Sequence, residues 1–143
     1  MLRRLSGLAV LFLTLWYSAP VVAAEPAVAD GKYTLVLSRN GVDFHIWLVE
    51  FTTEKGKSSA RLVATAPIMQ TARMTKAEIS PDKVQLLFDA DGSKFDVQIK
   101  PSAELLRGDV SIDDAAIMPV RLEPSKLKNM SKYTEGTPGD GHT

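Results

Sequence analysis

The chain has 143 residues, of which 45% are hydrophobic and 24% are charged, with no cysteine and a formal net charge of zero. This length allows one ordinary globular domain, and the apolar fraction is too high for a disordered chain. The balance of acids and bases excludes a polybasic nucleic-acid surface, and the absence of cysteine excludes disulfides, thiol catalysis and cysteine-ligated zinc.

The first 24 residues have the layout of a secretory signal peptide. A pair of arginines precedes an apolar run over residues 8–16, and small residues follow up to Ala24. Ser18 and Pro20 interrupt the apolar character, so the run falls short of the roughly 20 residues of a membrane-spanning helix. We therefore expect cleavage after Ala24, an exported protein in the periplasm or outside the cell, and no membrane span after cleavage. A retained anchor is the alternative, and residues 25–30 are expected to be flexible.

Three strands are predicted at the start of the mature chain. Apolar residues alternate over 32–38, and Asn40-Gly41 favours a tight hairpin because both residues tolerate positive φ. A long strand is expected over 42–53 and a third over 60–66.

Both faces of the long strand are predicted to be apolar. One face carries Phe44, Ile46 and Leu48, and the other carries His45, Trp47, Val49 and Phe51. Such a strand lies centrally, with one face in the core and the other covered by a second sheet, another subunit or a partner.

Five further short strands follow. They are expected over residues 74–80, 84–89, 94–100, 104–112 and 117–122. Residues 68–79 also contain good helix formers, and we favour a loop followed by a strand. Pro81 and Asp91-Gly92 mark turns, and Gly108 marks a bulge or a close approach of two strands.

The pattern predicts an all-β domain over residues 31–124. About eight short strands without a convincing helix are typical of an antiparallel meander closing as a small barrel or sandwich. Residues 125–143 are polar and glycine-rich, so we expect a disordered tail whose deletion leaves the fold intact.

The closing strands resemble those of small secreted β-meander domains of bacterial envelope proteins. The residues that carry the resemblance are Phe95-Asp96-Val97-Gln98-Ile99, Leu106-Arg107-Gly108-Asp109-Val110 and Met118-Pro119-Val120-Arg121-Leu122. The resemblance covers residues 31–124 and implies a fold, and it carries over no catalytic residue.

Candidate catalytic and metal-binding residues are few. His45 is the one histidine expected in an ordered strand, where a structural role is the usual one. Asp89, Asp91 and Asp96 surround the turn at Gly92, but their spacing does not match a calcium-binding EF-hand loop, so a plain turn is expected. We assign no catalytic residue, metal or cofactor.

The apolar faces of the long strand are the feature that points to a function. They indicate an exported, non-enzymatic β-domain that binds an envelope protein or an apolar small molecule through Phe44, Trp47 and Phe51, unless these residues are ordinary core. The alternative is a small periplasmic hydrolase using His45 with a nearby acid or serine. That function requires His45 to reach solvent in a pocket beside its partner.

Overall fold

The computed structural model describes residues 28–69, 71–102 and 106–139, and the expected signal peptide over residues 1–24 lies outside them. Within these ranges the elements are β1 (Gly31–Arg39), β2 (Val42–Glu54), β3 (Lys57–Thr65), β4 (Ala72–Ser80), β5 (Lys83–Ala90), β6 (Ser93–Pro101), β7 (Leu106–Ile112), β8 (Ala116–Ser125) and β9 (Thr137–Pro138). The predicted all-β fold is confirmed. Nowhere in these ranges is there a helix with the length and apolar character needed to cross a membrane.

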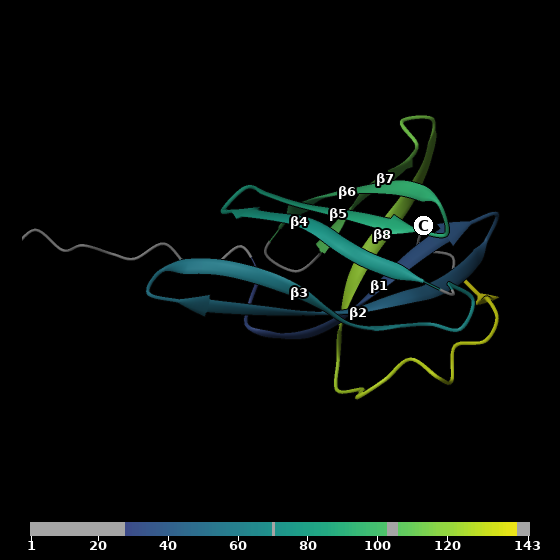
Figure 1. The fold of residues 1–143 in the computed structure, drawn as a ribbon, viewed down its shortest axis with the longest axis horizontal. Coiled ribbons are helices and arrows are strands. Elements are labelled where there is room, and N and C mark those ends of the chain that lie inside the picture. Colours follow the sequence, from purple (N-terminus) through teal and green to yellow (C-terminus); the bar gives the residue numbers. More distant parts are fainter. Residues whose placement is uncertain (1–27, 70, 103–105, 140–143) are drawn as a thin grey trace, which may run out of the picture.

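The strands form one antiparallel sheet that is nearly closed into a barrel. Its order is β3-β2-β1-β8-β7-β6-β5-β4, and the pairing of β1 with β8 joins the first strands of the meander to the last. Among the described residues, β3 and β4 follow one another in the meander but do not pair with each other. They therefore form the two edges of the sheet. A seam therefore separates β3 from β4 (Figure 1).

A β-bulge in β2 reverses the alternation of its side chains. Leu35 and Val36 are consecutive on β1 and face Trp47 and His45, so Ile46 has no partner of its own on β1. An extra residue of this kind shifts the side chains beyond it to the opposite face. Trp47 points into the core, whereas His45 lies on the outer face. The prediction that these two residues share a face is therefore wrong.

Aromatic rings fill the barrel interior. Trp47 is fully buried and stacks on Phe88 of β5 with 4.0 Å between ring centroids, and Phe95 of β6 packs edge-on against it at 5.3 Å. Phe51 is buried against Tyr33 at 5.5 Å, while Phe44 is half-buried against the same core. Trp47 and Phe51 thus pack as core residues.

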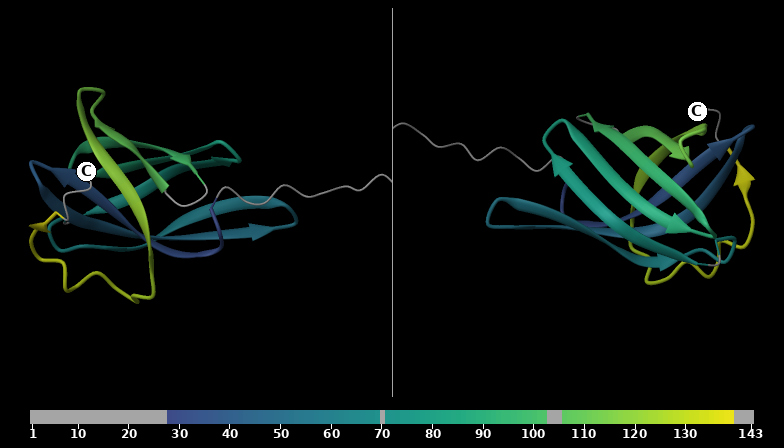
Figure 2. Two further views of the ribbon diagram at one scale, coloured as in Figure 1. Left: turned by 180° about the vertical axis from the view of Figure 1, so that it is seen from behind. Right: turned by 45° about the horizontal axis from the view of Figure 1, so that its top comes forward.

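Residues 126–139, here called the strap, cross the outer face of β2 and β3 (Figure 2). Met130 is buried against Leu48 of β2 and Ala66, with Leu127 and Tyr133 packed around it. This course differs from the disordered tail expected from the polar composition, because apolar residues spaced three apart anchor the segment to the sheet. The chain itself therefore covers the outer apolar face of the long strand.

The end of the strap pairs with β2. In β9, Thr137 and Pro138 face Asp43 and Val42, along the part of the β2 edge that β3 leaves free. Gly139 donates from its backbone nitrogen to the carbonyl of Gly41 at 2.8 Å. The strap is thus held by backbone pairing as well as by apolar contacts.

The residues just before β1 are also packed. Val28 is buried in the core, and the Tyr33 hydroxyl donates to the carbonyl of Ala29 at 2.8 Å. A flexible segment was expected over residues 25–30. The burial of Val28 and the hydrogen bond from Tyr33 to Ala29 place the described part of it against the barrel.

Gly108 allows β6 and β7 to approach closely. It faces Ile99, and a Cβ at this position would overlap the backbone carbonyl of Gln98. Backbone cannot yield as a flexible side chain does, so we expect Gly108→Ala to lower the free energy of unfolding by about 1–3 kcal/mol in urea denaturation. The exposed neighbour Asp109→Ala is the control. Equal stability of the two variants would contradict the close approach.

Candidate functional site

The seam is the first candidate site. Strands β3 and β4 have nine residues each and pair with β2 and β5 on one side, so the other edge of each strand faces the seam. Both strands contain a register shift, at Val63 in β3 and Thr75 in β4. Bulges bend and twist an edge strand, which accounts for the divergence of β3 from β4. Figure 1 shows the β2–β3 hairpin leaving the barrel body while β4 stays beside β5.

The core reaches solvent along the seam. The core-facing residues of its two strands are half-buried and include Ala60 and Leu62 on β3 and Ala72, Met74, Ala77 and Ile79 on β4. The equivalent residues on the neighbouring strand β5, Val84, Leu86 and Phe88, are fully buried. Covering the seam with another strand would bury apolar surface, which is favourable in water.

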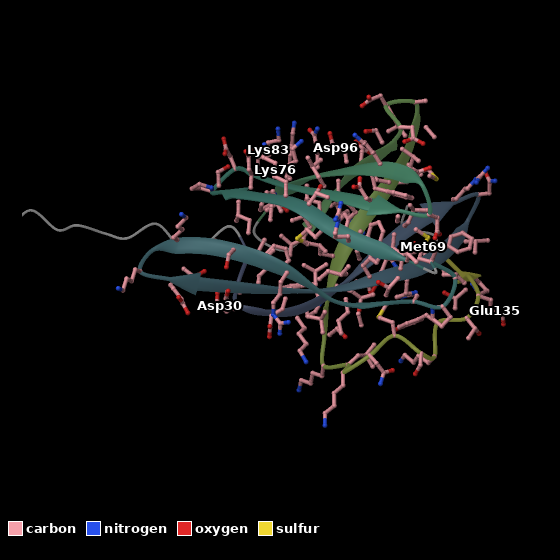
Figure 3. The ribbon with its side chains drawn as sticks, in the orientation of Figure 1. Asp30, Met69, Lys76, Lys83, Asp96 and Glu135 are labelled. Atoms are coloured by element: carbon pink, nitrogen blue, oxygen red, sulfur yellow. The ribbon has the colours of Figure 1, made fainter. Side chains whose placement is uncertain are left out.

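Most of the charged outward side chains of the edge strands are basic. They include Lys57 and Arg61 on β3 and Arg73 and Lys76 on β4. Glu78 is the one acid on either strand, and Figure 3 shows Lys76 on the outer side of the sheet. Arg61, Arg73 and Lys76 each pair with a carboxylate yet stay 67%, 78% and 51% exposed. Exposed pairs of this kind are weak, so these cations remain open to other anions.

A second candidate is an ion-pair cluster on the outer face of β1, β2 and β8. Arg121 donates to Asp43 at 2.8 Å and to Glu123 at 2.9 Å, and the Ser38 hydroxyl donates to Asp43 at 2.8 Å. The hydrogen bond from Arg121 lowers the pKa of Asp43, and Asp43 in turn raises the pKa of Arg121. The cluster links side chains of three strands, and removal of one partner would leave a buried charge uncompensated.

His45 lies beside this cluster and beneath the strap. Its ring stacks on Tyr133 with centroids 4.4 Å apart and planes 7° apart. In the described part of the chain, its buried Nδ1 has no hydrogen-bond partner. The Ser38 hydroxyl is bound to Asp43, so serine, histidine and acid do not form the relay that nucleophilic catalysis uses. The hydrolase alternative stays a prediction.

The three aspartates at the β5–β6 turn have separate partners. Asp89 accepts from Arg73 at 3.4 Å, Asp91 from Thr71, and Asp96 from Gln85 at 3.0 Å. Within the described ranges, no group of three or more histidine, aspartate or glutamate side chains is arranged to hold a metal ion. These residues behave as members of a turn and its flanking strands.

Stability is expected to fall on acidification because of His45. Burial lowers the pKa of His45 below its ordinary value of 6.5. The positive charges of Arg121 and Lys132 also lower this pKa, whereas the negative charges of Glu123 and Asp43 oppose the shift without reversing it. The unfolded chain then binds a proton at a pH where the folded chain does not, so the free energy of unfolding decreases as the pH falls through about 6.5.

His45→Phe keeps the ring contact with Tyr133 and removes the titrating group. We expect the decrease between about pH 7 and pH 5 to be smaller in this variant, as measured by urea unfolding across that range. An identical pH profile in the two proteins would show that His45 does not titrate differently on folding.

Comparison of the chain with protein-family models, with curated proteins and with solved structures yields no match. The assignment of a function therefore rests on the geometry of the seam and of the strap. Sequence reasoning missed both features. The signal that could have found the seam is the small size of core-facing residues in the third and fourth strands, alanine at positions 60, 72 and 77.

Proposed function

We propose that this chain is an exported, non-enzymatic β-domain that binds a protein partner through the seam between β3 and β4. The observation that carries the proposal is the presence of two nine-residue strand edges and a half-buried apolar row at one place on the barrel. Unpaired edges bind extended polypeptide segments by backbone hydrogen bonding, and the pockets beside them accept alternate side chains. Export is supported by the signal-like residues 1–24 and by the resemblance to envelope β-domains.

A protein partner is favoured over an apolar small molecule. The burial of Trp47 and Phe51 leaves their side chains without solvent-facing surface for a ligand, and the strap covers the opposite face of β2. Backbone edges, in contrast, are recognised by another backbone. The seam thus supports the protein-binding half of the predicted function.

Site-specific photocrosslinking in cells tests this proposal. A photoreactive residue at Ser59 of β3 or Thr75 of β4, both exposed, should form an adduct with the same partner protein. The matched control is Gln98, which is exposed on the fully paired strand β6. The purified partner should then bind the unlabelled chain saturably and block both adducts. Equal labelling from Gln98, or no adduct from either seam position, would contradict the proposal.

A further inference from the structure

We infer that the seam selects a partner strand whose core-facing residues are apolar and whose outward residues are acidic. This inference rests on the proposed function, because it specifies the chemistry of the partner at the same surface. Three observations carry it: the half-buried row of core-facing residues, the basic outward residues, and the unfavourable charges that a second copy of the chain would bring.

The apolar side of the partner strand follows from the half-buried row. A strand added at the edge of β3 or β4 continues the alternation of the sheet, so every second side chain points toward the barrel core. There it meets Leu62 on β3, or Met74 and Ile79 on β4, all half-buried in the free chain. Apolar residues at these positions would complete the burial of the core, whereas charged residues would lose hydration there.

The acidic side of the partner strand follows from the outward residues. Cross-strand neighbours on one face lie about 4.5–5.5 Å apart, so outward residues of an added strand lie beside the basic side chains of the edge. Arg61 on β3 and Lys76 on β4 lie near the middle of their strands and are 67% and 51% exposed. Carboxylates at the facing positions are attracted to these groups, and lysines are repelled.

A second copy of the chain is a poor occupant of the seam. Arg61 and Lys76 are the central residues of β3 and β4. If β3 pairs antiparallel with β3 of a second copy, centre to centre, the two Arg61 side chains face each other. The same pairing of two β4 strands brings the two Lys76 side chains together. Antiparallel pairing of β3 with β4 about their centres likewise places Arg61 opposite Lys76. Like charges directly opposite each other destabilise a strand pair, so the seam fits a different, acidic chain.

The experiment uses two labelled eleven-residue peptides, one alternating valine with glutamate and the other alternating valine with lysine. Fluorescence anisotropy with the full chain should show saturable binding of the glutamate peptide, at least about tenfold tighter than binding of the lysine peptide. The double variant R61E/K76E should reverse this preference. The matched control K94E/K100E makes the same charge change at exposed positions of the paired strand β6 and should preserve it.

Each other outcome has a definite meaning. Equal binding of the two peptides, or a preference unchanged in R61E/K76E, overturns the inferred charge selectivity and leaves binding at the seam intact. Absence of binding by either peptide overturns the inference that a strand adds at this edge. Adducts from Ser59 and Thr75 would then still support the proposed function, so the failure of the inference and the failure of the function are distinguishable.

Discussion

Replacing Arg121 with methionine is expected to lower the free energy of unfolding by about 3 kcal/mol, as measured by urea denaturation near neutral pH. The change removes the guanidinium that bonds to Asp43, a residue only 4% exposed. The remaining bond from Ser38 does not neutralise the carboxylate, so the folded state retains a buried charge without a cation.

Two further variants make this expectation specific. Arg107→Met removes an exposed arginine at the position of β7 that faces Arg121 and should change the free energy of unfolding by less than about 0.5 kcal/mol. Adding Asp43→Asn to Arg121→Met should recover part of the loss, because it removes the uncompensated charge. An Arg121→Met variant as stable as Arg107→Met would contradict the role given to the cluster.

The ion-pair cluster also makes the stability of the fold depend on pH in the acidic range. The hydrogen bond from Arg121 lowers the pKa of Asp43 in the folded chain. The ionised carboxylate therefore contributes to stability at pH values above 3.8, the ordinary pKa of aspartate. This contribution is lost as the pH falls through the lower pKa of the folded chain. This window lies below that of His45, whose ordinary value is 6.5. The Arg121→Met variant should therefore lose less stability than the original chain in the lower window.

Replacing Met130 with alanine is expected to cost about 2–5 kcal/mol, the usual range for a buried methionine. The change opens a cavity between the strap and the residues beneath it, Leu48 and Ala66. Ile117→Ala is the control, since that side chain is 70% exposed and its loss should be nearly neutral. Thermal or urea unfolding measures both.

Removal of the whole strap provides a stronger version of the test. A chain ending at Ser125 should have a lower unfolding midpoint and should bind a hydrophobic dye, because the outer faces of Leu48 and Ala66 become exposed. An unchanged midpoint and no dye binding would mean that the segment behaves as the disordered tail expected from its composition.

The local features of the fold were predictable from the sequence. Asn40 and Asp91 adopt the positive φ values of 52° and 51° that their Asn-Gly and Asp-Gly pairs indicate. Alternation over the sixth strand matches its burial, with Phe95, Val97 and Ile99 in the core. Such features depend on a few neighbouring residues, so a pattern in the chain is enough to reveal them.

The bulge at Ile46 was not predictable in the same way. With apolar residues on both sides of the long strand, either side fits the core equally well, and alternation alone cannot locate an extra residue. The position of His45 on the outer face follows only from its pairing with Val36 of β1. A shift of one residue in this pairing decides whether the His45 side chain points into the core or contacts the strap.

The strap and the seam depend on contacts between distant parts of the chain. The strap is a polar segment with three apolar or aromatic residues, Leu127, Met130 and Tyr133. These residues are ordered only because they pack against an apolar outer face of β2 that no other strand of the described ranges covers. The edges of β3 and β4 alternate like the paired strands, and whether they meet depends on the twist accumulated around the barrel. Within the described residues, the strap covers the outer face of β2 and strand pairing closes the rest of the barrel, so the seam is the part of the sheet that stays open.

Residue-resolved amide hydrogen exchange tests the central claim most directly, first on the free chain and then with the valine–glutamate peptide. We predict that alternate amides along β3 and β4 exchange far faster than the amides of β5 and β6 in the free chain, and that the peptide slows exchange at those edges and nowhere else. Uniform protection of β3 and β4 in the free chain would mean that the seam is already paired, which would contradict the proposed binding surface.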